Sequence, residues 1–252
     1  MKQNFYAAGL FFMALFFSPQ KRKITVFIAG DSTAANKEVK AFPETGWGMP
    51  FAYMFDSTVT VDNRAKNGRS TRTFISEGLW KKLIDDVKEG DYVLIQFGHN
   101  DESKEKTDRY TTPDEFKANL VRFITETRNK KAVPVLLTPV TRRQFDANGT
   151  IKETHAEYAP LVRDVASQYD VPLIDLDEKS KELVQQFGPE NSKLLYMQLE
   201  PGEHPNYPEG RNDNTHFNEL GARKMAQLVL WSIKDLHLGL ADHIRPPLAV
   251  KK

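Results

Sequence analysis

Apolar, β-branched runs recur along the chain, and each run is followed by residues typical of a loop. The five runs of strand length are Ile24–Ala29, Thr58–Val61, Tyr92–Gln96, Val133–Thr138 and Pro172–Asp175. Continuous apolar runs of this length favour strands that are buried on both faces of a sheet. The pattern therefore predicts five buried strands.

Segments with a helical spacing of apolar residues lie between these runs. Thr112 is a candidate N-cap, because Pro113 and acidic residues follow it in what would be the first turn. Glu153–Tyr169 and Glu219–Leu236 also have helical patterns. The alternation of strands and helices predicts an α/β fold, in which right-handed crossovers place helices on both faces of a parallel sheet.

One segment, Glu200–Asn214, is rich in Pro, Gly and Asn and is predicted to be a long loop. A long loop inside a compact domain is more often functional than idle. The sequence shows no internal repeat and no interdomain linker. We therefore expect a single domain over residues 21–252.

Residues 1–20 have the pattern of a secretory signal peptide. Lys2 precedes the uncharged, largely apolar run Phe5–Phe17, which is too short to span a bilayer. A buried first helix or an uncleaved anchor is the alternative interpretation. We expect a secreted protein, extracellular or periplasmic, with no stable membrane insertion of the mature chain.

The composition narrows the possible chemistry. With 35 Lys and Arg against 34 Asp and Glu, the net charge is +1, so no overall field favours nucleic acid as a partner. The 252 residues include no cysteine, which excludes disulfides, thiol nucleophiles and thiolate metal sites. None of these features specifies an oligomeric state.

Candidate chemical groups follow three of the predicted strands, where ligands bind in open parallel sheets. Ser32 comes just after the first strand, Gly68 lies in the segment after the second, and Asn100 follows the third. Ser32 is a candidate nucleophile or a helix N-cap, and a helix beginning there would place N–H groups beside its hydroxyl. The glycine N–H and the Asn amide can stabilise an oxyanion or shape a turn.

Near the C-terminus, Asp213 and His216 are spaced so that both can lie on one side of a single turn. His216 can then take a proton from a serine while Asp213 orients the imidazole. A metal site that adds His204 is the alternative, although a carboxylate and a histidine without a clear third ligand make a poor site. The spacing therefore favours a Ser-His-Asp arrangement without a metal.

Together, these four segments resemble the motifs of the SGNH hydrolases, also called GDSL-type esterases and lipases. The motifs stand here as Gly30–Thr33 (GDST), Asn67–Ser70 (NGRS), Gly98–Asp101 (GHND) and Asp213–His216 (DNTH). The resemblance covers residues 24–235. It implies a flavodoxin-like, three-layer α/β/α sandwich with a five-stranded parallel sheet, which agrees with the five apolar runs.

Within that family, the chain most resembles the rhamnogalacturonan acetylesterases. The features that carry this resemblance are GDST in place of GDSL, Asn63–Ser70, Gln96–Asp101, Thr138–Arg143 and Asp213–Phe217. The resemblance implies a secreted carbohydrate esterase that removes acetyl groups from a plant cell-wall polysaccharide. Its partner would be an acetylated polysaccharide or oligosaccharide, with pectic rhamnogalacturonan as the favoured substrate.

The resemblance also assigns roles to the motif residues. Ser32 is the nucleophile, His216 the base, and Asp213 the residue that orients His216. The backbone N–H groups of Ser32 and Gly68, with the side chain of Asn100, form the oxyanion hole. The implied mechanism passes through an acyl-serine intermediate and needs no metal or organic cofactor.

Four further residues are candidate substrate contacts: Arg69, His99, Arg142 and Arg143. A guanidinium pairs well with a carboxylate, and the galacturonate units of pectin carry carboxylates. The alternative is that the arginines form ion pairs at the surface and that His99 holds its own loop.

Three other functions are compatible with the sequence. An SGNH esterase or lipase acting on other short-chain esters, or on acetylated xylan, would use the same residues. A non-catalytic carbohydrate-binding protein would share the scaffold but would not need a complete triad. A glycosidase would need two carboxylates that flank a sugar, and no such pair stands out.

Overall fold

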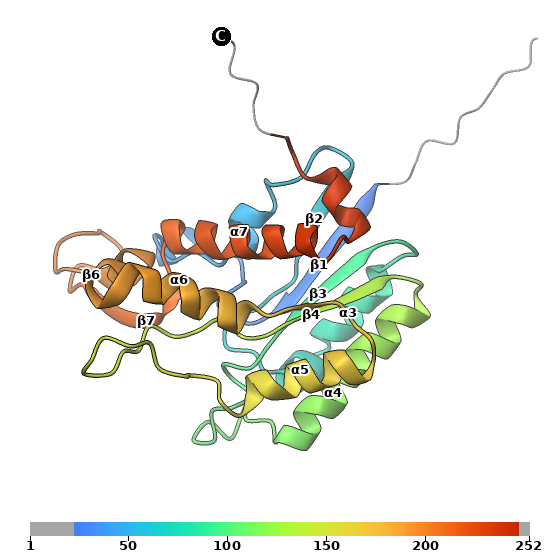
Figure 1. The fold of residues 1–252 in the computed structure, drawn as a ribbon, viewed down its shortest axis with the longest axis horizontal. Helices are drawn as coiled ribbons and strands as arrows, with labels where there is room; N and C mark the ends of the chain where they lie inside the picture. The colour runs from blue at the N-terminus through green and yellow to red at the C-terminus, as the bar shows by residue number, and fades with distance from the viewer. Residues whose placement is uncertain (1–22, 247–252) are drawn as a thin grey trace, which may run out of the picture.

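The computed structural model describes residues 23–246, which fold around a five-stranded sheet (Figure 1). The strands are β1 (Ile24–Gly30), β2 (Val59–Asn63), β3 (Tyr92–Gln96), β4 (Val133–Leu137) and β5 (Leu173–Ile174). They pair in the order β2-β1-β3-β4-β5, and every pair is parallel. The predicted five-stranded parallel sheet is confirmed, with the strand order of a flavodoxin-like doubly wound fold.

The burial of each strand follows from its place in the sheet. All five residues of the central strand β3 are buried, whereas the edge strand β2 has no fully buried residue. β2 extends to Asn63, two residues beyond the predicted end at Val61, and β5 contains only Leu173 and Ile174. The polar end of β2 lies outside the apolar run, so hydrophobic patterning did not include it.

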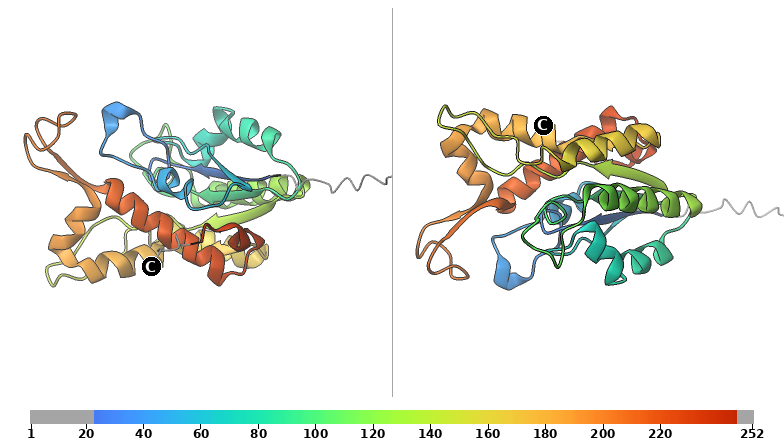
Figure 2. Two further views of the ribbon diagram at one scale, coloured as in Figure 1. Left: turned by 90° about the horizontal axis from the view of Figure 1, so that it is seen from above. Right: turned by 90° about the horizontal axis from the view of Figure 1, so that it is seen from below.

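Helices cover both faces of the sheet. The α-helices are α1 (Gly48–Phe51), α2 (Thr71–Ser76), α3 (Leu79–Asp86), α4 (Pro113–Asn129), α5 (Tyr158–Gln168), α6 (Leu176–Asn191) and α7 (Glu219–Asp235), and the short 3-10 helices are η1 (Val39–Ala41), η2 (Ser192–Leu195) and η3 (Gly239–His243). One apolar core lies between the sheet and α1, α6 and α7, and the other between the sheet and α2 to α5 (Figure 2). The three-layer arrangement is therefore confirmed.

The N-cap predicted for α4 is confirmed. The Thr112 hydroxyl accepts the Glu115 N–H, and the Glu115 carboxylate accepts the Thr112 N–H in return. The last predicted helix is also present as α7, one residue shorter than expected. In contrast, α6 was not predicted, because its sequence is largely charged and polar and is interrupted by Gly188, which has a φ of 71°.

The predicted helix over Glu153–Tyr169 is wrong in its first turn, since α5 begins only at Tyr158. The residues before α5 bond instead to the loop after β4. The Thr154 hydroxyl accepts the Arg142 N–H at 3.0 Å, and the His155 imidazole lies 2.8 Å from the Val140 carbonyl oxygen. These long-range contacts hold the segment outside the helix.

The predicted loop Glu200–Asn214 is wrong from Arg211 onwards. β7 (Arg211–Phe217) pairs antiparallel with β6 (Tyr196–Leu199) in a hairpin that projects from the rest of the fold (Figure 2). The first half of β7 consists of polar residues with low strand propensity, which concealed the strand. The site residues Asp213 and His216 are therefore on a strand.

The tip of this hairpin folds back onto η1. The Asn206 side chain donates to the carbonyl oxygens of Val39 and Phe42 at 2.8 and 2.9 Å. The Tyr207 hydroxyl donates to the Ala41 carbonyl at 2.9 Å. The tip is therefore attached to the segment that follows β1.

The signal peptide predicted over residues 1–20 lies outside the described residues. Within residues 23–246, no helix combines the length and the apolar character that crossing a membrane requires.

Gly221, in the first turn of α7, packs against the chain that precedes β6. A Cβ at this position would lie 1.9 Å from the Leu195 carbonyl oxygen, so the backbone would have to move. We expect Gly221→Ala to lower the free energy of unfolding by about 1–3 kcal/mol, the usual cost of overpacking, despite the higher helix propensity of alanine. Thermal unfolding followed by circular dichroism measures this, with Gln227→Ala as control. Equal stability of Gly221→Ala and the wild type would contradict it.

Candidate active site

Ser32 lies on a turn that begins where β1 ends. Residues 32–35 form this turn, so the helix considered at Ser32 does not form, and the next helical residues are those of η1. The turn is held by its own aspartate, because Oδ1 of Asp31 accepts the Thr33 N–H at 2.9 Å and the Thr33 hydroxyl at 2.8 Å. The serine is therefore presented by a fixed turn.

The turn packs against the segment that leads into α1. The Trp47 N–H donates to the Thr33 carbonyl at 2.9 Å, and a Cβ on Gly46 would lie 2.1 Å from the Ala35 carbonyl oxygen. The buried Trp47 indole donates to Oε1 of Gln96 at 2.8 Å. These contacts join the nucleophile turn to the end of β3.

Ser32, His216 and Asp213 form a hydrogen-bonded chain. Oγ of Ser32 is 2.8 Å from Nε2 of His216, and Nδ1 of His216 is 2.8 Å from Oδ2 of Asp213. The bond from Nδ1–H to the carboxylate leaves Nε2 free to accept the serine proton. The structure thus brings together three predicted residues from opposite ends of the chain, in the geometry of a nucleophile, a base and an orienting carboxylate.

Asp213 and His216 face one another across an irregular part of β7, not within the single turn that the sequence suggested. Oδ1 of Asp213 accepts the N–H groups of Thr215 and His216 at 2.8 and 3.0 Å. Burial alone would raise the pKa of Asp213, but the hydrogen bond and charge of His216, with these N–H groups, hold it well below its usual range. Asp213 therefore carries the negative charge that stabilises an imidazolium.

The second and third motifs reach the same edge of the sheet as Ser32. The chain after β2 continues along β1, since the Lys66 N–H donates to the Gly30 carbonyl at 3.0 Å. Gly68 has a φ of 74°, a conformation that favours glycine. Within residues 23–246, no group accepts a hydrogen bond from the backbone N–H of Ser32 or Gly68. Both N–H groups are available to an oxyanion.

Two neighbours fix the orientation of the Asn100 amide. Nδ2 donates to the Arg69 carbonyl at 3.0 Å, and Oδ1 faces Nη1 of Arg109 at 3.5 Å. Since a carbonyl only accepts and a guanidinium only donates, both contacts require the same orientation. The second Nδ2 proton of Asn100 is then available to a ligand, as the predicted oxyanion role requires.

A buried lysine that the sequence analysis missed joins the first two motifs. Nζ of Lys37 lies 2.7 Å from the Ser32 carbonyl, 2.8 Å from Oδ1 of Asn67 and 2.7 Å from Oε1 of Glu44. Its side chain is 1% exposed, and the three acceptors match the three protons of the ammonium group. Lys37 therefore positions the backbone of Ser32 relative to Gly68, and no pattern in its segment indicates this.

Two of the predicted substrate arginines are engaged by internal partners. Nε of Arg69 is 2.9 Å from Oε2 of Glu77. Nε of Arg143 donates to the Ser192 hydroxyl at 3.0 Å, and its Nη1 donates to Oδ1 of Asn214 at 2.8 Å. The Arg69 contact fits the ion-pair alternative, whereas these partners of Arg143 are neutral. Contact with substrate stays a prediction for both residues.

Arg142 and His99 belong to a polar cluster beside the third motif. Nη1 of Arg142 is 2.6 Å from Oε1 of Glu102, whose other oxygen is 3.0 Å from Nδ1 of His155. The His155 ring packs edge-to-face on the His99 ring, with centroids 4.5 Å apart. His99 is 6% exposed, its ring nitrogens have no hydrogen-bond partner among the described residues, and burial holds its pKa well below the usual value. His99 therefore packs as a neutral ring, and its contact with substrate stays a prediction.

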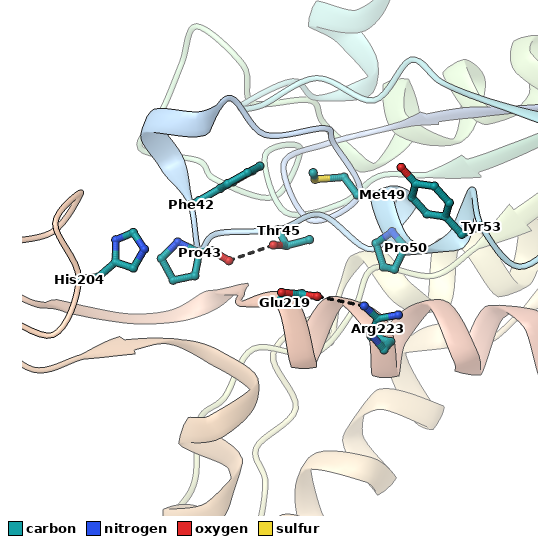
Figure 3. A pocket seen from close by; sticks show the side chains of 9 residues that line it. All are labelled: Phe42, Pro43, Thr45, Met49, Pro50, Tyr53, His204, Glu219 and Arg223. Carbon is teal, nitrogen blue, oxygen red and sulfur yellow. Dashed lines mark hydrogen bonds and ion pairs between the residues drawn. The ribbon is translucent and has the colours of Figure 1, made fainter.

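An apolar hollow of about 460 Å³ lies between the segment after η1, the hairpin tip and the start of α7 (Figure 3). It is lined by Phe42, Pro43, Thr45, Met49, Pro50, Tyr53, His204, Glu219 and Arg223. His204 lies here and accepts the Asn206 N–H at 3.1 Å, while Ser32 and Asp213 engage both nitrogens of His216. Among the described residues, His204 does not join Asp213 and His216 in a group that could share a metal ion.

Among residues 23–246, the acidic side chains that lie close enough to share a cation are Glu153, Asp177 and Glu178. Nζ of Lys181 already lies 2.6 Å from Glu153 and 2.8 Å from Glu178, and Arg163 is 2.9 Å from Asp177. Lys181 and Arg163 therefore balance the negative charge of these three carboxylates.

Lys37→Met removes the ammonium group and keeps the length of the side chain. We expect kcat for an acetate ester to fall by roughly ten- to a hundredfold, with a smaller change in KM, because misplaced donors weaken the transition state more than substrate binding. The double variant Lys37→Met/Glu44→Gln avoids an unpaired carboxylate at the partly buried Glu44 and serves if the single variant does not fold. The exposed Lys81→Met is the control. A wild-type kcat in the double variant would rule out the positioning role.

Asp101, next to Asn100, is a fully buried carboxyl group. Its Oδ1 accepts the N–H of Thr71 at 2.9 Å and the Thr71 hydroxyl at 2.6 Å, while Oδ2 has no partner among the described residues. Burial raises the pKa of Asp101 to about 7, against the effect of these bonds. The folded state therefore binds this proton more tightly than the unfolded state, so stability falls as the pH rises from about 4 to about 7.

Asp101→Asn keeps an acceptor for Thr71 but cannot ionise. Relative to the wild type, we expect its free energy of unfolding to increase by about 2–3 kcal/mol between pH 5 and pH 8, because only the wild type loses the proton. Urea unfolding at both pH values measures the difference, with the exposed Asp85→Asn as control. If the difference between Asp101→Asn and the wild type is the same at both pH values, Asp101 is not the titrating group.

The sequence matches the model of the GDSL-like Lipase/Acylhydrolase family over residues 28–224. It is 45% identical over 224 residues to the rhamnogalacturonan acetylesterase RhgT of Bacillus subtilis (strain 168), which covers 89% of this chain and 95% of that protein. It is 36% identical over 220 residues to the probable rhamnogalacturonan acetylesterase YesY of the same organism, which covers 87% of this chain and 96% of that protein.

Solved structures share the fold. The YxiM protein of Bacillus subtilis superposes with a TM-score of 0.75 at 27% identity, over 86% of this chain and 58% of that chain. Axe2, an acetylxylan esterase from Geobacillus stearothermophilus, superposes with a TM-score of 0.60 at 16% identity, over 84% of this chain and 94% of that chain, which speaks for the fold alone. The predicted fold class is confirmed, and the chain belongs to the GDSL-like lipase/acylhydrolase family.

Proposed function

We propose that this protein is a serine esterase that removes acetyl groups from pectic rhamnogalacturonan. The observation that carries the proposal is the chain of hydrogen bonds from Ser32 through His216 to Asp213. Beside it lie the N–H groups of Ser32 and Gly68, which have no acceptor among residues 23–246. The substrate class is supported by two relatives, 45% and 36% identical, that are named a rhamnogalacturonan acetylesterase and a probable one.

In the first step, Nε2 of His216 takes the Ser32 proton while Oγ attacks the acetyl carbonyl carbon. Asp213 stabilises the imidazolium that forms. The carbonyl oxygen becomes an oxyanion and accepts hydrogen bonds from the N–H groups of Ser32 and Gly68 and from the Asn100 amide. Loss of one such donor typically costs about 3–4 kcal/mol of transition-state stabilisation.

The tetrahedral intermediate then collapses. His216 gives its proton to the leaving sugar hydroxyl, and the acetyl group stays on Ser32. In the second step, His216 removes a proton from water, which attacks the acetyl carbonyl, and the returning proton restores the serine as acetate leaves. In both steps, His216 transfers the protons, and the N–H groups and the Asn100 amide stabilise the oxyanion.

The alternative functions make different demands on the same site. An ester of xylan or a small alcohol would react at the same serine, so the triad does not discriminate between these substrates. The two relatives named for rhamnogalacturonan are 45% and 36% identical to this chain, against 16% for the acetylxylan esterase, and so favour the pectic polymer. A non-catalytic binding protein would have no need of a serine hydroxyl 2.8 Å from an imidazole that is itself bonded to a carboxylate. The arrangement therefore favours catalysis.

The proposed substrate also sets the location. A cell-wall polymer lies outside the cytoplasm, so we place the enzyme in the extracellular space or the periplasm. The apolar run Phe5–Phe17 supports this as the core of a signal peptide over residues 1–20. Residues 21–252 would then form the catalytic domain.

Acetate release from acetylated rhamnogalacturonan, acetylated xylan and 4-nitrophenyl acetate tests the proposal. We expect the pectic polymer to be the best of the three substrates. Ser32→Ala should lower kcat by roughly a thousandfold or more, because the variant lacks the hydroxyl that attacks the acetyl group. Ser76→Ala, an exposed serine on α2, is the control, and circular dichroism checks the fold of both variants.

Each other outcome selects a different function. Release from xylan or the small ester alone would retain the triad and reject the pectic substrate. Near-normal turnover by Ser32→Ala would reject the nucleophile, and no release from any substrate would favour a binding protein.

A further inference from the structure

Arg109 lies in the loop between β3 and α4, and its guanidinium has more N–H donors than acceptors among the described residues. Its Nε and Nη2 face Oδ2 of Asp108 at 3.3 and 3.2 Å, and its Nη1 faces Oδ1 of Asn100 at 3.5 Å. These are the side-chain hydrogen bonds of Arg109 within the described residues. Since a guanidinium carries two protons on each terminal nitrogen, one N–H on Nη1 and one on Nη2 have no partner in the described part of the chain.

The guanidinium of Arg109 borders the predicted oxyanion hole. Nη1 lies 3.2 Å from the position that a Cβ on Gly68 would take, and it also faces the Asn100 amide. The side chain is 30% exposed, so it contacts both residues and still faces solvent. A substrate group bound by Arg109 therefore lies close to the reacting acetyl group.

The backbone that carries Arg109 is anchored on both sides. Arg72, on α2, donates from Nη2 to the Thr107 carbonyl at 2.6 Å. The Thr111 N–H donates to the Asp101 carbonyl at 3.0 Å. The guanidinium thus occupies a defined place relative to the third motif, which favours recognition of a ligand over a mobile surface charge.

The partner that Arg109 has in the protein is a weak one. Asp108 is its neighbour in sequence, and the Asp108 side chain is 68% exposed. Exposed ion pairs contribute little because water screens them. A carboxylate on a ligand can therefore bind at the two unpartnered N–H groups or replace Asp108, and planar carboxylates suit the guanidinium fork.

The geometry points to a specificity role: we propose that Arg109 binds the carboxylate of a galacturonate unit at or beside the acetylated sugar. This inference rests on the proposed function, because galacturonate carries the only ionised group of that polymer. Arg69, Arg142 and Arg143 have less capacity for this task, since each bonds to side chains from other segments of the fold. Arg109 would thus favour acidic oligosaccharides over neutral ones.

The test compares acetate release from acetylated rhamnogalacturonan oligosaccharides whose carboxyl groups are free with release from the same oligosaccharides as methyl esters. We expect the wild type to favour the free acids in kcat/KM by roughly ten- to a hundredfold, the usual range for a charged hydrogen bond. Arg109→Gln should bring this ratio close to one, and Arg109→Lys should keep part of it. Arg122→Gln, which removes an exposed arginine on α4, is the control and should keep the full ratio.

Using the ratio separates charge recognition from any shift of Asn100, because such a shift affects both substrates alike. A wild-type ratio near one, or a full ratio in Arg109→Gln, would overturn the inference and leave the proposed function intact. An equal loss on both substrates would instead place Arg109 at the oxyanion. If Arg109→Gln does not fold, the wild type and Arg109→Lys still decide. Absence of acetate release from either oligosaccharide, with hydrolysis of 4-nitrophenyl acetate, would reject the proposed function and this inference with it.

Discussion

The site depends on the pairing of β1 with β2 on one side and with β3 on the other. Gly30, the last residue of β1, pairs with Gln96, and its carbonyl accepts the Lys66 N–H at 3.0 Å. A Cβ on Gly30 would lie 2.9 Å from the Gln96 carbonyl oxygen. Glycine at this position therefore allows the ends of β1 and β3 and the segment after β2 to lie this close together. Backbone hydrogen bonds between the strands therefore place the first three motifs at one edge of the sheet. His216 reaches the same edge by a different route, on a hairpin that follows the sheet in sequence.

Features encoded locally were predictable from the sequence. The apolar runs gave the five strands, because burial on both faces requires continuous apolar residues. Thr112 identified the start of α4, because the capping interaction involves residues only three positions apart. The order of the four motifs gave the family and the residues that assemble at the sheet edge, since the strand ends of this fold meet there.

Features that depend on distant partners were not predictable in the same way. β7 contains polar residues, and its pairing with β6 makes it a strand. Lys37 bonds to Asn67, which lies 30 residues away in sequence, and no pattern in the segment around Lys37 specifies this contact. The contacts of Arg143 with Ser192 and Asn214 join segments that are distant in sequence, and so does the approach of Arg109 to Gly68, which comes from the loop after β2.

The hairpin that carries His216 is attached to the fold at its far end as well, where Asn206 donates to the carbonyls of Val39 and Phe42. Together with the Ser32–His216 hydrogen bond, this attachment completes a closed ring of bonded segments. The ring runs from the serine to the histidine, along the hairpin to its tip, and back through the segment after β1. In such a ring, a change in the length of one segment must be accommodated by the other segments or by the hydrogen bonds that join them. The spacing between base and nucleophile is therefore set partly by the number of residues in the hairpin tip, and an insertion or deletion there acts on catalysis from a place that touches neither residue.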